Sequence, residues 1–251
     1  MQVLYTTCIT TLTPFADAQL DKKTEAFDAL KSEILTLDLA PGEALDEARV
    51  AERFGLSRTP MREVLQRLAG AGFVDIQAHR GAKVVSMDLG IMRTFFQTAP
   101  LIYCSVARLA AENHSGDQLD RLVAIQHDFT RVIKLGDPAA AATYNHHFHA
   151  QIGAMADNPY LQAALERMLI DHTRLSQTFY RPASKQETEL VMTASHHHDE
   201  MIEGFRDRNA DAVVEITLKH WDLSRNQLER FVKPDPLPLD IEENSEPRHA
   251  V

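Results

Sequence analysis

The sequence predicts a mainly α-helical protein, with an N-terminal winged helix-turn-helix domain followed by a larger all-α domain. Three observations indicate this fold class. Short helical and strand-like patterns alternate between residues 21 and 87, and apolar residues then keep a helical period to residue 232. In addition, positive charge gathers in the first part of a chain that is acidic elsewhere.

Two helices are expected before the first turn of the N-terminal domain. The first covers residues 22–37, where apolar side chains recur at helical spacing until a Pro-Gly step ends the pattern. Residues 1–20 show no clear period, and we expect them to form a flexible arm. A second, short helix is expected over residues 46–54, with Asp46 as its N-cap.

The third helix is expected to begin at Thr59-Pro60 and to end near Ala71. Proline suits the first helical position, where its missing N–H costs no hydrogen bond, and it pushes the preceding residue out of the α region. Thr59 is therefore the expected N-cap. The following segment, GFVDIQAHRGAKVV, alternates apolar and polar residues on both sides of AHRG, which predicts a β-hairpin, the wing. The domain is expected to span residues 21–87.

The second domain is expected to span residues 88–232 and to be helical throughout. Turn and capping residues divide it into six helices; these breaks lie near Gly116, Gly136-Asp137-Pro138, Asn158-Pro159, Pro182 and Asn209. Residues 233–251 are rich in proline and acidic residues, so we expect a disordered acidic tail.

Composition excludes several classes of protein. No apolar run approaches the ~18 residues that a membrane span requires. The N-terminus lacks the basic start and the continuous apolar stretch of a signal peptide. The 2 cysteines form no CxxC motif and are too few for a disulfide framework, which fits a reducing compartment. We therefore expect a cytoplasmic protein that does not contact membranes.

Charge is distributed unevenly along the chain. The formal net charge is −10, but residues 49–83 contain seven Lys or Arg against three Asp or Glu, a local excess of +4. The remainder of the chain therefore carries about −14. A small basic module attached to a larger acidic one is typical of a nucleic-acid-binding domain joined to another domain.

The stretch GLSRTPMRE, residues 55–63, sets Arg58 and Arg62 one helical turn apart at the start of the third helix. A helix dipole disfavours cations at this end by roughly a few tenths of a kcal/mol. Their presence suggests an anion nearby, and a DNA phosphate or a guanine edge is the natural candidate. The alternative is an exposed surface on which these arginines pair with Glu52 or Glu63.

The segment PGEALDEARVAERFGLSRTPMREVLQRLAGAGFVDIQAHRGAKV resembles the DNA-binding head of GntR-type bacterial transcription regulators. This resemblance implies that the following residues contact double-stranded operator DNA: Arg49, Ser57, Arg58, Thr59, Arg62, Arg80 and Gly81. Arg58 and Arg62 would lie in the major groove, and Arg80 and Gly81 would form the wing tip beside the minor groove. Such heads bind as a homodimer to a palindromic operator.

Three histidines are predicted to point inward from three different helices. His149, His198 and His220 lie on the apolar stripes of their helices, and Asn145 lies one turn before His149. A buried polar group without a partner costs roughly 1–3 kcal/mol, so these imidazoles need partners. One divalent metal would satisfy all three; the alternative is three core histidines that each bond a separate carbonyl or hydroxyl.

The second domain resembles the FCD effector domain of FadR-like GntR regulators, a six- or seven-helix bundle. The family pattern is Asp or Asn, three residues, His, and later two histidines 22 apart, which Asn145, His149, His198 and His220 match. The resemblance implies a bound divalent ion (zinc, nickel or manganese) and a small carboxylate effector that alters operator affinity. Asn145 replaces the Asp of many relatives, and an amide oxygen is a weaker ligand than a carboxylate.

Many relatives carry an Arg and a Glu where Ala99 and Tyr103 stand in this sequence, and that Arg often contacts the carboxylate of the effector. Their absence implies a different effector or another donor. Arg93, Arg174 and Tyr180 are the candidate effector-binding residues, with a purely structural role as the alternative for each.

Two other functions are compatible with these residues. The first is a metal-dependent hydrolase, because many hydrolytic sites hold a metal with three histidines and keep one coordination position open. However, Asp199 and Glu200 should face away from the site, because adjacent helical residues diverge by about 100° from the direction of His198. Lacking a general base, the chain is not expected to be an enzyme. The other possibility is a regulator for which the metal itself is the signal.

Overall fold

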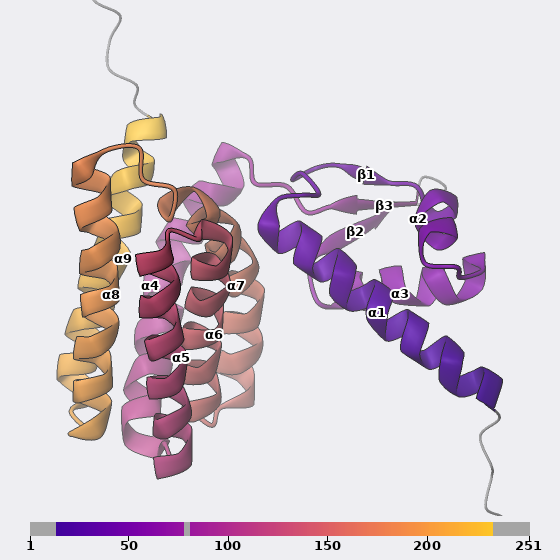
Figure 1. Ribbon diagram of the computed structural model, residues 1–251. Helices are drawn as coiled ribbons and strands as arrows, with labels where there is room; N and C mark the ends of the chain where they lie inside the picture. Colours follow the sequence, from indigo (N-terminus) through magenta and orange to yellow (C-terminus); the bar gives the residue numbers. More distant parts are fainter. Residues whose placement is uncertain (1–13, 78–80, 233–251) are drawn as a thin grey trace, which may run out of the picture.

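The computed structural model describes residues 14–77 and 81–232 of the protein (Figure 1). The chain forms two lobes, a head with helices α1–α3 and a small sheet, and a bundle of helices α4–α9. The predicted fold class is therefore confirmed. The expected acidic tail, 233–251, and residues 1–13 of the expected arm lie outside the described residues.

The head is built from three helices and three strands: α1 (Pro14–Thr36), β1 (Ala44–Leu45), α2 (Glu47–Arg53), α3 (Arg58–Gly70), β2 (Val74–Gln77) and β3 (Gly81–Val84). Helix α1 starts earlier than expected, so residues 14–20 are helical and extend the predicted helix rather than the arm. Asp46 is the N-cap of α2, as predicted; its carboxylate accepts the N–H groups of Ala48 and Arg49 at 2.8 and 3.1 Å.

Helix α3 begins two residues before the predicted position. Its N-cap is Ser57, which has an extended backbone, and Thr59 is already helical, so the expectation that Thr59 is the N-cap was wrong. Pro60 at the third helical position is tolerated because none of the first four N–H groups of a helix has an intrahelical partner. As a consequence, Arg58 and Thr59 both lie on the first turn of α3.

The wing is a three-stranded antiparallel sheet in the order β1-β3-β2. The predicted hairpin is present: β2 pairs with β3 so that Val74 lies opposite Val84 and Gln77 opposite Gly81. Strand β1 was not expected, because two residues are too few to show a strand period. It pairs with β3 through Leu45, which lies opposite Ala82, and so connects the wing to the start of α2.

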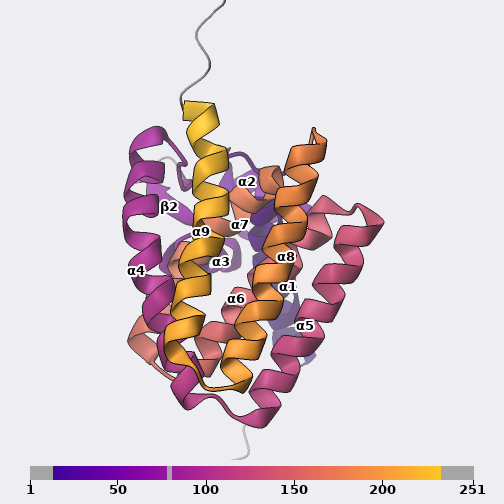
Figure 2. The same cartoon turned by 90° about the vertical axis from the view of Figure 1, so that its left-hand side faces the viewer.

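The bundle contains six described helices, as predicted: α4 (Leu89–Asn113), α5 (Gly116–Leu135), α6 (Pro138–Met155), α7 (Pro159–Phe179), α8 (Lys185–Arg206) and α9 (Ala210–Val232). Figure 2 shows α8 and α9 in front of α6 and α7, between α4 and α5. The helices end at the predicted breaks. Ser115 and Gln118 form a capping box at the start of α5, and Gly136, in the left-handed conformation at φ 68°, ends this helix.

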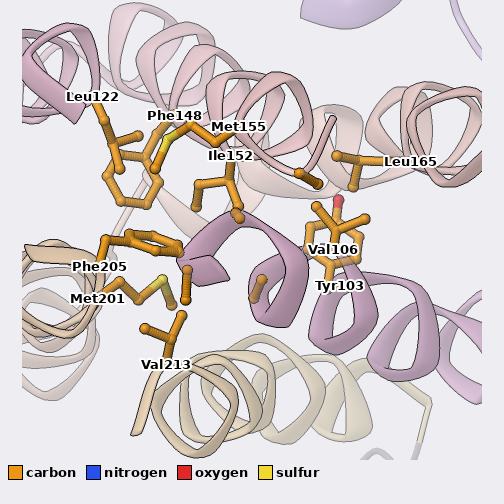
Figure 3. Packing of buried hydrophobic residues seen from close by; sticks show 14 of the residues in the cluster. Tyr103, Val106, Leu122, Phe148, Ile152, Met155, Leu165, Met201, Phe205 and Val213 are labelled. Atoms are coloured by element: carbon orange, nitrogen blue, oxygen red, sulfur yellow. The ribbon is translucent and has the colours of Figure 1, made fainter. Parts of the chain in front are cut away.

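The core of the bundle is formed by large apolar side chains from helices that are distant in sequence (Figure 3). Phe148 of α6, Phe205 of α8 and Val213 of α9 are completely buried in this cluster, together with Leu122 of α5. Because burial of one such side chain stabilises a fold by roughly 1.5–3 kcal/mol, this cluster holds the helices in place around the histidines described below. No described helix is long and apolar enough to cross a membrane.

Helix α7 belongs to both lobes. On one side, Ile170 is buried among the core residues of the head, and the Gln177 Nε2 donates a hydrogen bond to the Leu35 carbonyl of α1 at 3.2 Å. Arg174 donates to the carbonyl of Val85, which lies between the wing and α4, at 2.9 Å. The other side of α7 packs against α4 and α6 within the bundle. A shift of α7 would therefore move residues that contact the head.

Candidate DNA interface and metal centre

An open groove of about 890 Å³ runs along the head between α2, α3 and the sheet. Arg58, Thr59 and Arg62 of α3 form one wall of this groove, and Gly81 of β3 lies in its lining. The structure thus brings together four of the seven residues predicted to contact DNA. Ser57 and Arg49 are exposed at the starts of α3 and α2, whereas Arg80 lies outside the described residues.

The arginines of the groove are available to an anion. The side chain of Arg62 is 72% exposed, and its nearest carboxylate is that of Glu47 at 3.9 Å, rather than that of Glu52 or Glu63. An exposed pair at this separation contributes roughly 0–1 kcal/mol. Arg58 forms no salt bridge within the part of the chain that the structure describes. Two guanidinium groups therefore lie at the groove without a close salt bridge, and Asp46 and Glu47 are the acidic residues of its lining.

Gly81 has a structural role that the sequence does not reveal. Its φ is +81°, and a Cβ atom at this position would lie 2.9 Å from the carbonyl oxygen of Leu45. Only glycine allows β1 and β3 to approach this closely. Gly81 is consequently needed for the shape of the groove wall, whether or not it also contacts DNA.

In the bundle, α6, α8 and α9 bring His149, His198 and His220 together. One ring nitrogen from each lies within 4.8 Å of the others, and the side chains are 3%, 0% and 5% exposed. These are the three histidines that the apolar stripes predicted to point inward. Asn145, one turn before His149 on α6, is also buried.

Several nitrogens in this cluster have no hydrogen-bond partner. They are Nε2 of His149, Nε2 of His198 and Nδ1 of His220, all buried. Three separate protein partners, the alternative to a metal, are thus not found for these atoms among the described residues. Since metal–nitrogen bonds are about 2.0–2.1 Å long, nitrogens within 4.8 Å of one another can converge on one ion after small side-chain rotations. The donor set fits a divalent transition metal.

Gln126 of α5 determines the proton position on His198. Its Nε2 donates to the Ser195 carbonyl at 3.0 Å and to the Asp199 carboxylate at 2.9 Å, which fixes the orientation of the amide. The Gln126 Oε1 must then accept the Nδ1–H of His198, at 3.0 Å. Nε2 of His198 is left with its lone pair, as a metal ligand requires. A glutamine on the apolar stripe of α5 is the sequence signal that could have identified Gln126 as a partner of the buried histidines.

The imidazoles of the cluster are neutral. Burial lowers the pKa of His149 and of His198 well below the usual value, and the neighbouring imidazoles lower both further. Burial likewise lowers the pKa of His220 to about 3, and His172 contributes in the same direction. Neutral rings carry the lone pairs that bind a metal, so no proton has to be displaced at neutral pH.

Asn145 and Tyr180 form a second polar group beside the histidines. The hydroxyl of Tyr180 donates to Oδ1 of Asn145 at 3.0 Å, and Nδ2 of Asn145 faces the Ser176 hydroxyl at 3.4 Å. Tyr180, one of the three candidate effector residues, therefore reaches the site. The amide oxygen of Asn145 already accepts one hydrogen bond, which leaves it one lone pair for a metal.

The two arginines among the candidate effector residues are placed elsewhere. Arg93 is exposed near the start of α4, ten positions and about 15 Å of helix axis before Tyr103. Arg174 is buried, but its guanidinium pairs with the Asp171 carboxylate and donates to the Val85 carbonyl. The structure thus does not bring these arginines together with the histidines, because Arg93 faces solvent and Arg174 connects α7 to the head.

Tyr103 and His172 line the site and were not predicted to do so. The hydroxyl of Tyr103 lies 2.8 Å from Nδ1 of His172, and both rings pack against His149. A small cavity of about 10 Å³, room for about one water, adjoins Tyr103 and His149. His172 falls on the buried stripe of α7 with Leu165 and Leu169, so helical periodicity could have found it.

Comparison with known families finds one matching family model for the head and one for the bundle. Residues 22–84 match the family model "Bacterial regulatory proteins, gntR family", and residues 96–223 match the model of the FCD domain. The chain belongs to the GntR family of transcription regulators. Its second domain is an FCD domain, which corresponds to the histidine-containing bundle. Members of these families are DNA-binding regulators and not enzymes, so the hydrolase interpretation is set aside.

Individual relatives are distant but similar over most of their length. The chain is 25% identical over 196 residues to the HTH-type transcriptional repressor RspR of Escherichia coli, covering 78% of this chain and 84% of that one. It is 23% identical over 213 residues to the HTH-type regulator YdhC of Bacillus subtilis, covering 82% and 92%. The solved structure of E. coli McbR/YncC has the same fold, with a TM-score of 0.72 at 17% identity over 84% of this chain and 99% of that one.

Proposed function

We propose that this GntR-family regulator is a homodimeric, one-component switch that acts in the cytoplasm. Its FCD domain binds a divalent metal and a small carboxylate effector, and effector binding changes the affinity of the two heads for a palindromic operator. The observation that supports this proposal best is the cluster of three buried histidines from α6, α8 and α9, each of which has one ring nitrogen within 4.8 Å of the others and one ring nitrogen without a partner. They lie in a chain whose head exposes a groove lined by arginines.

The metal ligands would be His149, His198 and His220, with the amide oxygen of Asn145 as a fourth donor. When bound, zinc, nickel or manganese would supply positive charge and open coordination positions for an anionic ligand. Every one of these protein donors is neutral, so the protein itself does not compensate the charge of the ion. A carboxylate is therefore the class of effector that the site favours. The Tyr180 hydroxyl could donate to such a ligand only by giving up its hydrogen bond to Asn145.

Helix α7 would transmit effector binding from this site to the DNA-binding head. The cavity beside His149 has room for about one water, so a carboxylate of several atoms requires the surrounding helices to move apart. Helix α7 carries His172 beside His149 and also carries Ile170 and Arg174, which pack and bond against the head. A shift of α7 would change the relative placement of the two heads, with a coupling free energy of typically ~1–3 kcal/mol.

On the operator, Arg58 and Arg62 would contact bases and phosphates in the major groove, together with Ser57 and Thr59. Arg49 would add a phosphate contact. The wing residues Arg80 and Gly81 would approach the minor groove, and a two-fold symmetric dimer would read the two half-sites.

The DNA-binding part can be tested with Arg58→Ala on an operator selected in vitro from random DNA. We expect a loss of about 1–3 kcal/mol in binding free energy at fixed salt, measured by fluorescence anisotropy. Arg121→Ala, which removes an exposed arginine from α5, is the matched control and should bind as tightly as the unaltered protein. Equal affinity of both variants for the operator would remove Arg58 from the interface.

The effector part can be tested by metal analysis followed by a carboxylate screen. We expect close to one metal per chain by mass spectrometry in untagged protein that is purified without chelator, and none in His149→Ala. Trp221 is the single tryptophan of the sequence, and the centre of its ring lies 4.7 Å from that of Tyr103. Its fluorescence should therefore change when a ligand binds at this site. Operator affinity that follows metal concentration without any carboxylate would instead support a metal sensor.

A further inference from the structure

A second pocket, distinct from the histidine cluster, lies at the junction of the two lobes. Its volume is about 250 Å³, and its walls come from α1 of the head and from α6 and α7 of the bundle. Lys31 lies on the α1 side, His146 and His147 on α6, and Gln177 on α7. Any molecule bound here contacts both domains at once.

Two hydrogen-bond acceptors belong to residues that line this pocket. The Thr173 hydroxyl donates to the Leu169 carbonyl at 2.6 Å, so it can only accept from Nδ1–H of His146, at 2.8 Å. Nε2 of His146 is then an acceptor. Gln177 is 2% exposed, its Nε2 donates to Leu35, and its Oε1 is buried without a partner. A ligand that suits this wall has to bring a hydrogen-bond donor.

The same pocket also carries a positive charge. Lys31 lines the pocket and forms no salt bridge within residues 14–77 and 81–232. The acidic side chain in the lining, Asp28, is exposed. A cation in a pocket with an unpartnered acceptor, Oε1 of Gln177, and a second acceptor, Nε2 of His146, favours an anion that retains a hydroxyl group.

We propose that this junction pocket binds a small phosphate-bearing metabolite. The phosphate would pair with Lys31, and a hydroxyl of the ligand would donate to Oε1 of Gln177 or Nε2 of His146. Sulfate has the same size and shape as phosphate but carries no proton near neutral pH, so it cannot supply the donor. The volume of the pocket leaves room for an organic part beside the phosphate. By bridging α1 and α7, such a ligand would fix the head against the bundle.

The test is isothermal titration calorimetry on the full chain at neutral pH with three probes: inorganic phosphate, glycerol 3-phosphate and sulfate at matched ionic strength. Both phosphates should bind about tenfold or more tightly than sulfate, because sulfate leaves the buried acceptors unpaired. Tighter binding of glycerol 3-phosphate than of inorganic phosphate identifies a monoester as the natural class, and the reverse order identifies free phosphate.

Four variants test the location of the site. Lys31→Met and Gln177→Glu should each weaken phosphate binding about tenfold or more, whereas Lys185→Met, at an exposed lysine on α8, should not. Melting temperatures and operator binding show that each variant is folded. His149→Ala should bind phosphate normally, so this site can fail or succeed independently of the metal centre. Equal affinities for sulfate and phosphate, unchanged binding by Lys31→Met, or loss of binding in His149→Ala would each overturn the assignment.

Discussion

Metal binding should stabilise the bundle because it pairs three buried histidine nitrogens, and the ratio of the metal concentration to its Kd sets the size of the effect. Without a metal, Nε2 of His149, Nε2 of His198 and Nδ1 of His220 are buried and unpartnered, at a cost of roughly 1–3 kcal/mol each. A ligand that binds only the folded state stabilises it by about 2.7 kcal/mol at a concentration 100 times its Kd. In a protein of this size, 1 kcal/mol shifts the melting temperature by about 2–4 °C. We therefore expect a rise of about 5–11 °C on saturation with metal.

The assay is differential scanning calorimetry of chelator-treated protein, alone and with zinc, nickel or manganese at 100 times the measured Kd. His149→Ala should show no rise in melting temperature with metal, because one of the three converging nitrogens is missing. His127→Ala removes an exposed histidine from α5 and is the matched control, which should retain the full shift. The reasoning is refuted if chelator-treated wild type melts at the same temperature with and without metal, or if His149→Ala responds as strongly as wild type.

Three further predictions concern Gln126, Arg174 and Gly81. Gln126→Leu should lower metal affinity about 10–100-fold in a chelator competition assay, because it no longer fixes the proton of His198 on Nδ1; unchanged affinity would contradict this role. Arg174→Met should lower the free energy of unfolding by about 3–5 kcal/mol in urea titrations, since a buried ion pair is broken, whereas exposed Arg93→Met should change it by less than about 0.5 kcal/mol. Gly81→Ala should destabilise the protein by about 1–3 kcal/mol, given its φ of +81° and the close carbonyl of Leu45; a neutral result would show that the wing adjusts freely.

Local signals in the sequence were sufficient to predict the helices and the β2-β3 hairpin, although not strand β1. Asp46 caps α2, Ser115 and Gly136 bound α5, and Pro-containing breaks separate the helices of the bundle where they were expected. These features depend on a few neighbouring residues, so they can be read without knowing the partners of the chain. The start of α3 was placed wrongly at Thr59 because proline is compatible with more than one position in the first turn.

The inward direction of His149, His198 and His220 was also readable, since helical period alone determines which face a residue occupies. Their convergence within 4.8 Å was not, because it depends on how α6, α8 and α9 pack. The same limit explains why Arg174 was expected at the effector site. Its position on α7 shows that it is buried, but not whether it faces the bundle or the linker residue Val85.

The sequence by itself determined the order and boundaries of most elements, the basic head with its two arginines on α3, and the three inward histidines. All of these depend on spacing along the chain. Only the tertiary structure decided that Gln126 orients His198, that α7 is shared by both lobes, and that Lys31 and Gln177 meet in a pocket between them. These relationships join residues that are far apart in sequence, and their geometry is set by the packing of whole helices rather than by any local preference.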